Sequence, residues 1–401
     1  MTASLSTDGL AHLHDVMTSH VEAGEMPGLV TLVARGEDVH VDAIGSPSFA
    51  GDTPLARSAI FRIASLTKPI TAAATMSLVE DGTLRLDQPV EDLLPELAQR
   101  RVLRAIDAAL DDTVAAVRPI TVEDLLSYRL GFGTVVAPPD SYPIQRAEGE
   151  LRLQSIGGPP WPPVAYDFDG WMAALGSLPL MYQPGEQWLY NTSGQVLGVL
   201  FARATGKDLE TVMRERIFEP LGMRDIGFTV PPDHVDRLTT FYTPDPENGE
   251  LSVLDDPTGS WWSSPPSFPD ASGGLVSTID DYWSFARMML AGGTLRRPRV
   301  LSPESVALIT ADRLSRTQRE AAGPFLGEHM SWGLGMAVPA TGSTAPLPVG
   351  FGWDGGSGTT WRSNSQSSVT GILFTQRQAV SPVPPPVVED FWAAVNAATI
   401  G

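Results

Sequence analysis

The sequence Ser65-Leu66-Thr67-Lys68 places a hydroxyl and an amine three positions apart. At the start of a helix, side chains three apart project from the same face, so the Lys68 amine can reach the Ser65 hydroxyl. A serine hydroxyl is a weak nucleophile until a neighbouring base takes its proton. The pair therefore predicts nucleophilic catalysis by Ser65, with Lys68 as its activating base.

Lysine usage supports this assignment. Of the 27 basic residues, only Lys68 and Lys207 are lysines. Arginine stays protonated in proteins, whereas a buried lysine can lose its proton and act as a base. Burial and a nearby positive dipole lower a lysine pKa, and a helix N-terminus supplies a positive end and free amides. The Ser65 amide is thus a candidate oxyanion donor, and Lys207, after the turn at Gly206, is interpreted as a surface residue.

Tyr190 is the second candidate for chemistry. It follows a Pro-Gly turn and precedes a predicted helix in the segment PGEQWLYNTSGQVLGV (184–199). A phenol near an amine can act as a base or relay a proton. The alternative is a packed aromatic side chain with a satisfied hydroxyl, because the chain has 7 tyrosines and spacing alone does not select this one.

A glycine-rich strand is the third candidate, with the sequence GWDGGSGT (352–359). Glycine weakens a strand unless something must approach the backbone closely, and a substrate lying along this strand would be such a reason. A backbone N–H here would complete an oxyanion hole. The alternative is a bulge or a tight turn.

The elements that must position these residues follow from periodicity and turn signals. The nearly all-apolar run after Thr67 predicts a buried central helix that ends at Gly82. Arg35-Gly36-Glu37-Asp38 predicts the turn of a hairpin. Helices are predicted at 8–23, 67–81, 90–115, 121–128, 170–176, 194–205, 208–218, 279–291 and 387–399, and strands within 28–45, 60–63, 330–338, 351–364 and 367–376.

Two Pro- and Gly-rich loops are expected at 131–169 and 255–270. Loops of this length in a compact domain are usually functional or disordered. Their tryptophans, Trp161, Trp261 and Trp262, favour packed loops, which either wall a pocket or only cover the core. Strands near both ends of the chain with helices between them predict an α+β fold, in which the terminal segments form one antiparallel sheet and a mainly helical region is inserted.

Composition excludes several classes of function. The formal net charge of −20 argues against nucleic acid and anionic membranes as partners. The chain has no cysteine, 6 histidines and no H-x-x-x-H pair, so neither a metal site nor a cofactor is expected. No G-x-S-x-G elbow of an α/β-hydrolase is present. The N-terminus has no basic, apolar leader, which predicts a cytoplasmic location, and the oligomeric state is left open.

Taken in order, these motifs resemble the β-lactamase-like serine hydrolases: class C β-lactamases, penicillin-binding proteins, family VIII carboxylesterases and lovastatin-type acyltransferases. The resemblance extends over about residues 8–398 and is carried by FRIASLTKPITA (61–72), PGEQWLYN (184–191), EPLGMRD (219–225) and SGGLVSTIDDYWSFARMML (272–290). It implies Ser65 as nucleophile, Lys68 as base, Tyr190 as the tyrosine of the second motif, and the amides of Ser65 and Gly356 as the oxyanion hole.

The sequence departs from the family pattern at two places. The family's Tyr-x-Asn has Thr192 at its third position here, with Asn191 one place earlier. The family's K-T-G is replaced by Trp353-Asp354-Gly355, which removes the lysine that helps to bind the carboxylate of penicillins. W-x-G resembles the esterase branch and favours a neutral ester or acyl substrate. The predicted substrate-binding residues are Trp353, Asp354, Gly355, Asn191, Trp261 and Trp262.

The expected activity is therefore that of a carboxylesterase working through an acyl-enzyme on Ser65. An acyltransferase, a β-lactamase or D-amino-acid peptidase, and a non-catalytic binding protein on the same fold are the alternatives. The resemblance also implies a β-lactamase/transpeptidase-like organisation, with a sheet domain formed by residues 1–82 and 271–401 and a helical domain formed by residues 83–270.

Overall fold

A seven-stranded antiparallel sheet forms the centre of the protein, in a computed structural model that describes residues 4–153, 164–295, 299–343 and 350–399. The strand order is β2-β1-β13-β12-β11-β10-β9. These strands are β1 (Gly28–Arg35), β2 (Asp38–Gly45), β9 (Met330–Trp332), β10 (Ala337–Pro339), β11 (Phe351–Gly355), β12 (Thr359–Asn364) and β13 (Val369–Thr375). Because β1 pairs with β13, the two ends of the chain build one sheet, as predicted.

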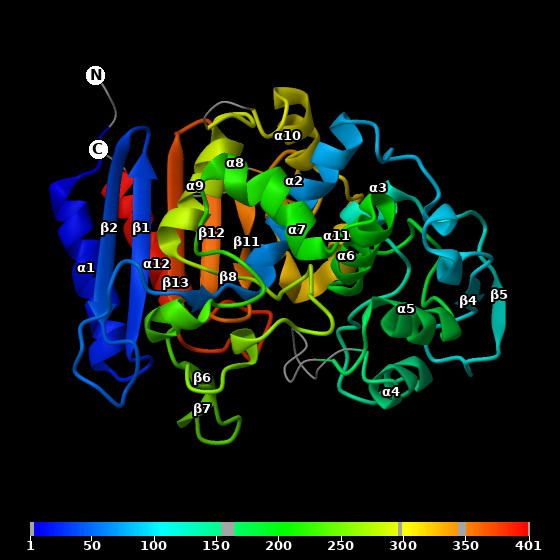
Figure 1. Ribbon diagram of the computed structural model, residues 1–401, viewed down its shortest axis with the longest axis horizontal. Coiled ribbons are helices and arrows are strands. Elements are labelled where there is room, and N and C mark those ends of the chain that lie inside the picture. The colour runs from blue at the N-terminus through cyan, green and yellow to red at the C-terminus, as the bar shows by residue number, and fades with distance from the viewer. Residues whose placement is uncertain (1–3, 154–163, 296–298, 344–349, 400–401) are drawn as a thin grey trace.

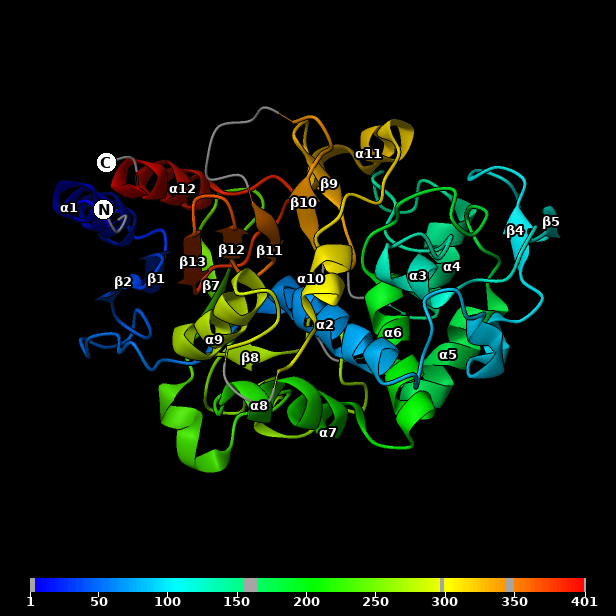
Figure 2. The same ribbon diagram turned by 90° about the horizontal axis from the view of Figure 1, so that it is seen from above.

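Helices cover both faces of this sheet. On one face lie α1 (Thr7–Glu22) and α12 (Pro386–Thr399), which bring the two ends of the chain close together, and on the other lie α2 (Thr67–Glu80) and α9 (Ile279–Leu290) (Figures 1 and 2). Strand β1 is apolar toward both layers: Leu29 and Val33 join the cluster under α1 and α12, whereas Val30 and Leu32 join the main core. This two-residue alternation follows from strand geometry.

Helix α2 is central because it has no polar face. Its residues from Thr67 to Leu78 are all buried, and Pro69 lies in its first turn, where a missing N–H costs little. A short 3₁₀ turn, η1 (Ala64–Leu66), comes directly before it. The predicted buried helix is therefore confirmed, with Ser65 at its entrance.

Of the remaining elements, α3, α4, α5, β4 and β5 lie in the right-hand part of the molecule in Figure 1, and the hairpin of β6 and β7 lies below the large sheet. The helices are α3 (Val122–Leu126), α4 (Pro143–Glu150), α5 (Phe168–Ser177), α6 (Thr192–Thr205), α7 (Leu209–Met213), α8 (Glu219–Leu221), α10 (Pro303–Ile309) and α11 (Arg316–Ala322). Small sheets pair β3 (Phe61–Arg62) with β8 (Val276–Ser277), β4 (Arg101–Leu103) with β5 (Thr113–Ala115), and β6 (Phe241–Pro244) with β7 (Leu251–Asp255).

The predicted helix over 90–115 is wrong. That segment holds two 3₁₀ turns, Val90–Asp92 and Pro95–Leu97, followed by the β4–β5 hairpin. Strand β4 also exchanges backbone hydrogen bonds with Leu180, since Leu103 donates to its carbonyl and its amide donates to Arg101. Pairing with chain more than 70 residues away therefore overrides a local composition that favours a helix.

Three other expectations need adjustment. The loop expected at 131–169 contains α4, and its residues 154–163, including Trp161, lie outside the described residues. The strand expected at 330–338 is two strands, because Gly333 and Gly335 turn the chain between β9 and β10. None of the described helices is both long and apolar enough to cross a bilayer.

Candidate active site

Ser65 and Lys68 meet at the entrance of α2, as their spacing predicts. The Lys68 Nζ lies 2.9 Å from the Ser65 Oγ, 3.0 Å from the Asn191 Oδ1 and 2.7 Å from the Ser272 carbonyl oxygen. The latter two oxygens only accept hydrogen bonds, so they take two N–H groups of the amine. In a neutral amine the lone pair is then directed at the Ser65 hydroxyl, which is the geometry of a base and its nucleophile.

The environment of Lys68 favours its uncharged form. The side chain is buried, with 1% of its surface exposed, and this burial lowers the pKa of Lys68 from its ordinary 10.5 to about 7. The negative charge of the buried Asp270 opposes this shift. The only other lysine in the sequence, Lys207, is half-exposed and pairs with Glu215, which is the ordinary surface role predicted for it.

The backbone before Ser65 is held in an unusual conformation. Ala64 has a φ of +44°, a region that residues with a Cβ rarely adopt. Its carbonyl accepts a hydrogen bond from the Thr67 hydroxyl at 2.7 Å, and that hydroxyl in turn accepts one from the Leu275 amide at 3.2 Å. Such strain persists only where surrounding contacts fix it, and it is concentrated at functional sites.

Tyr190 lies beside the pair, just before α6. The indole N–H of Trp353 donates to its hydroxyl oxygen at 2.8 Å, and its ring lies 4.4 Å from the Lys68 Nζ. Burial raises the pKa of Tyr190 well above its ordinary value, although hydrogen bonds with Ser65 and Trp353 oppose the shift. Because an indole N–H can only donate, the phenol proton is left to point toward Ser65. The neutral phenol is therefore a proton donor rather than a base.

Strand β11 comes close to η1 because of its glycines. A Cβ on Gly355 would lie 2.5 Å from the Ile63 carbonyl oxygen, so only glycine fits there. The following turn is tied to the same stretch, since the hydroxyls of Ser357 and Thr359 donate to the carbonyls of Arg62 and Ile63. Space is open at the Cα of Gly356. The close approach expected of this glycine-rich strand is thus toward the protein's own backbone next to Ser65.

A cavity of about 750 Å³ opens over this site. Its lining includes Ser65 and Tyr190 together with five residues predicted for oxyanion or substrate binding: Asn191, Trp353, Asp354, Gly355 and Gly356. The far walls are mostly apolar, with prolines from the loop before α4 and from the segment before α12, namely Pro138, Pro139, Pro382, Pro384 and Pro385. The carboxylate of Asp354 is paired with Arg362 at 2.7 Å.

Trp261 and Trp262 were predicted to bind substrate, but neither belongs to the described lining of this cavity. Trp262 is buried in a separate cluster, where its indole N–H donates to the Gly274 carbonyl at 2.8 Å. Its ring stacks under the guanidinium of Arg62, 5.1 Å away, and Arg62 forms a buried ion pair with Asp255. The 255–270 loop therefore covers an internal ion pair. Aromatic residues in a sequence fit a loop that covers the core and a loop that lines a pocket equally well.

Several residues of the site escaped the sequence analysis. The Ser272 carbonyl holds Lys68, and Asp270 accepts a hydrogen bond from the Ser272 amide at 2.7 Å. The ring of Phe325 stacks on Tyr190 with centroids 4.6 Å apart and lines the cavity. Only the resemblance of SGGL (272–275) to the family offered a signal here, because a lone Phe or Asp carries no local pattern.

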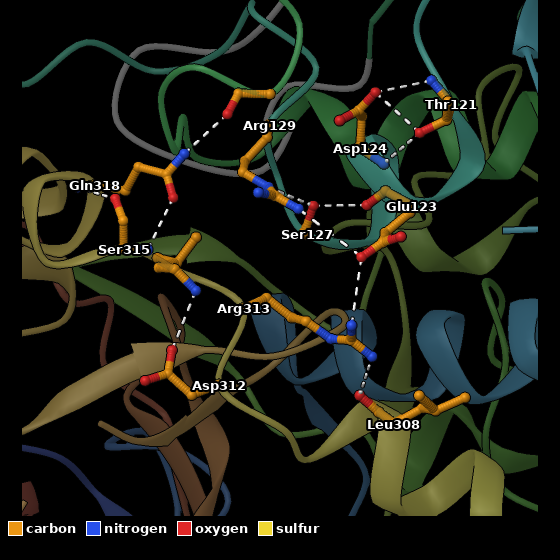
Figure 3. A network of polar contacts seen from close by, with 12 residues as sticks. Thr121, Glu123, Asp124, Ser127, Arg129, Leu308, Asp312, Arg313, Ser315 and Gln318 are labelled. Atoms are coloured by element: carbon orange, nitrogen blue, oxygen red, sulfur yellow. Dashed lines mark hydrogen bonds and ion pairs between the residues drawn. The ribbon is translucent and has the colours of Figure 1, made fainter. Parts of the chain in front are cut away.

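A polar network links the segment that carries Phe325 to other parts of the chain. Arg313 and Arg129 both contact the carboxylate of Glu123 on α3, at 3.4 and 3.9 Å (Figure 3). Gln318 of α11 donates to the carbonyls of Gly185 and Glu186. These contacts join α11, and the 3₁₀ turn Gly323–Phe325 that follows it, to the segment leading to Tyr190. The position of the Phe325 ring is therefore set jointly by two distant parts of the chain.

Comparison with known proteins fits this geometry. A family model described as Beta-lactamase matches residues 13–386. The chain belongs to the beta-lactamase family. Protein Rv1367c of Mycobacterium tuberculosis is 38% identical over 368 residues, which cover 88% of this chain and 87% of that protein. Esterase EstB of Burkholderia gladioli is 28% identical over 384 residues, which cover 91% of this chain and 90% of EstB.

The fold is likewise shared with solved structures. The structure of EstCE1, described as a hydrolase with promiscuous acyltransferase activity, superposes with a TM-score of 0.79 at 22% identity and covers 97% of this chain and 99% of that one. The α+β, β-lactamase/transpeptidase-like fold expected from the sequence is confirmed. Together with the family, the Ser65–Lys68 geometry supports an enzyme of the serine hydrolase type.

Proposed function

We propose that this protein is a carboxylesterase that forms an acyl-enzyme on Ser65. The observation that carries this proposal is the 2.9 Å contact between the buried Lys68 amine and the Ser65 hydroxyl, at the floor of a cavity with mostly apolar walls. A buried amine of lowered pKa can deprotonate a serine near neutral pH.

The residues divide the reaction between them as follows. The Ser65 oxygen attacks the ester carbonyl carbon while Lys68 takes its proton, and the amides of Ser65 and Gly356 stabilise the oxyanion. The carbon–oxygen bond to the alcohol then breaks, and the phenol of Tyr190 protonates the departing alkoxide. Lys68 returns its proton to Tyr190. Water then attacks the acyl carbonyl carbon while Lys68 takes its proton. The bond to the Ser65 oxygen breaks, and Lys68 gives the proton to that oxygen, which releases the acid and restores Ser65.

The charge of the cavity supports a neutral ester over a β-lactam. Its described lining includes the carboxylates of Asp140, Glu148 and Asp354, and no lysine, arginine or histidine. Arg362 pairs with Asp354. A penicillin or cephalosporin carries a carboxylate, which would find no lysine, arginine or histidine side chain among the described lining residues to pair with. Apolar walls favour the hydrocarbon part of an ester instead.

The test is a screen of p-nitrophenyl esters of graded acyl length alongside nitrocefin. We expect turnover of the esters, little of nitrocefin, and labelling of wild-type protein by a fluorophosphonate probe. Ser65→Ala should lose both ester turnover and labelling, whereas Ser381→Ala, which removes an exposed hydroxyl from the cavity wall, should keep both. Full ester turnover by Ser65→Ala would refute the proposal.

Acyl transfer is the second candidate. The cavity of about 750 Å³ has room for an acceptor alcohol beside the acyl group, and the structurally similar EstCE1 is described as having promiscuous acyltransferase activity. Adding an alcohol acceptor during ester turnover and measuring the ratio of new ester to free acid distinguishes the two activities. An acid-only product at high acceptor concentration would rule out transfer.

A further inference from the structure

A second cavity, of about 230 Å³, adjoins the first. The two cavities share four lining residues, Thr134, Val135, Val136 and Phe325, so they meet along this stretch of chain and the Phe325 ring. The rest of the second lining comes from the segment before Tyr190, from α11 and from three other aliphatic or aromatic positions: Gln187, Trp188, Leu189, Ala321, Ala322, Ile106, Tyr142 and Tyr182.

Two polar atoms at this cavity lack partners in the described part of the chain. The Gln187 Oε1, an acceptor, and the Trp188 Nε1, a donor, are both buried without a hydrogen bond. Trp188 as a whole is 97% buried, since 3% of its surface is exposed. A buried polar group without a partner costs free energy, so such groups are normally satisfied by protein, water or ligand. Since one atom accepts and the other donates, together they suit a group that both donates and accepts.

The second cavity lies near Tyr190, whose phenol is the proposed proton donor to the alcohol part of an ester. The proton donor to a departing alkoxide has to be within hydrogen-bond reach of its oxygen, and that donor is Tyr190. The lining residues are close neighbours of Tyr190: the Thr134 amide donates to its carbonyl at 2.9 Å, and the rings of Phe325 and Trp188 lie 4.6 and 5.7 Å from its ring.

The lining also indicates the charge of the group that would fit. No described residue that lines the second cavity carries a charged side chain, whereas three carboxylates line the first. An ionic group would be desolvated there without a counter-charge, at high cost. The Gln318 side-chain amide donates to the carbonyls of Gly185 and Glu186, which fastens α11 to the segment that carries Gln187 and helps to fix the shape of the cavity.

We propose that the second cavity is the alcohol subsite of this enzyme, which binds an uncharged alcohol portion bearing a hydroxyl or amide group through Gln187 and Trp188. This assignment rests on the proposed esterase function. It adds that the alcohol of the substrate carries a second, neutral polar group, and that selectivity for this group is set by Gln187.

The test compares butyrate esters of plain primary alcohols with the monobutyrates of the matching α,ω-diols (the hydroxyalkyl esters), over alcohol chains of two to six carbons. The quantity measured is the ratio of kcat/KM for the hydroxyalkyl ester to kcat/KM for the alkyl ester of equal length, which does not depend on the fraction of active protein. We expect wild-type protein to favour the hydroxyalkyl ester at one or more chain lengths. Gln187→Leu should reduce that ratio about 5- to 10-fold, the loss of one hydrogen bond.

Two further variants complete the test. Gln366→Leu makes the same substitution in the exposed turn between β12 and β13 and should leave the ratio unchanged. Ala321→Leu narrows the second cavity and should lower kcat/KM more for the longer alcohols than for the shortest. Two outcomes would overturn the subsite alone and indicate a cavity that holds only water. In the first, wild-type protein turns over the esters without preferring the hydroxyalkyl ester. In the second, Gln187→Leu leaves the ratio of the two kcat/KM values unchanged. Absence of turnover of every ester would overturn the esterase function, and the subsite with it.

Discussion

Replacing Asp270 by asparagine should move the pH dependence of the enzyme to lower pH. Asp270 accepts the Ser272 amide at 2.7 Å, and the carbonyl of the same residue accepts from Lys68 at 2.7 Å, so carboxylate and amine are separated by one residue of backbone. Burial lowers the pKa of Lys68 to about 7, and the charge of Asp270 is the one influence that raises it. An asparagine oxygen can keep the bond to the Ser272 amide while it removes that charge.

The size of the effect follows from Coulomb's law. Two opposite charges about 6 Å apart, at an effective dielectric constant of about 20, attract by about 3 kcal/mol. Since about 1.4 kcal/mol corresponds to one pKa unit, the loss of the charge should lower the pKa of Lys68 by about 1 to 2 units. The base works in its neutral form, so a lower pKa leaves more of it active in acid.

The assay is the pH profile of kcat/KM on p-nitrophenyl butyrate, because this quantity reports the pKa values of the free enzyme. Wild-type activity should rise through about pH 7, and that of Asp270→Asn about 1 to 2 pH units lower. Asp281→Asn is the matched control: burial raises the pKa values of the Asp270 and Asp281 carboxyls alike, each to about 6, but Asp281 accepts from the Asp225 amide, away from Lys68. If the pH at which kcat/KM rises is unchanged in Asp270→Asn, or is higher than in wild-type protein, the reasoning is refuted.

Three other perturbations test separate parts of the structure. Tyr190→Phe should lower kcat about 10²- to 10⁴-fold, because it removes the proton donor, and should lower the melting temperature slightly, because it also removes the acceptor of the buried Trp353 indole N–H; unchanged kcat would exclude the donor role. Gly355→Ala should destabilise the protein by about 1 to 3 kcal/mol in denaturant unfolding and lower kcat/KM, since its Cβ would meet the Ile63 carbonyl at 2.5 Å; wild-type stability would show that β11 can shift freely. Arg62→Met leaves the buried Asp255 carboxylate unpaired and should cost about 3 to 5 kcal/mol. The double variant with Asp255→Asn should recover much of that loss, and equal stability of single and double variants would argue against the ion pair.

The sequence predicted the elements whose pattern is local. The apolar run after Thr67 could only be a buried helix, and Arg35 to Asp38 could only turn a hairpin, because each pattern repeats within a few residues. It failed at 90–115, where hydrogen bonds to Leu180 turn a helix-favouring composition into a hairpin. It also failed at Trp262, whose aromatic character suits a pocket wall and a cover over Arg62 equally well.

The site divides in the same way. The contact between Ser65 and Lys68 needs only one turn of helix, so the separation of three residues along the sequence was enough to predict it. Asn191 was predicted to bind substrate, yet its Oδ1 is held by the Lys68 amine, an arrangement that accompanies a φ of +77° at this residue. No sequence pattern predicts that φ angle, although asparagine adopts positive φ more readily than most residues.

The sequence by itself therefore selected the groups that are proposed to do the chemistry: a hydroxyl and one of two lysines three residues apart, a tyrosine before a helix, and glycines on a late strand. The tertiary structure alone decided how those groups behave. Loss of water from around an amine depends on segments far apart in the chain, here the carbonyl of Ser272 and the amide oxygen of Asn191. The walls and the second cavity arise in the same way, since a cavity is the space left between packed segments and no single stretch of sequence encodes it.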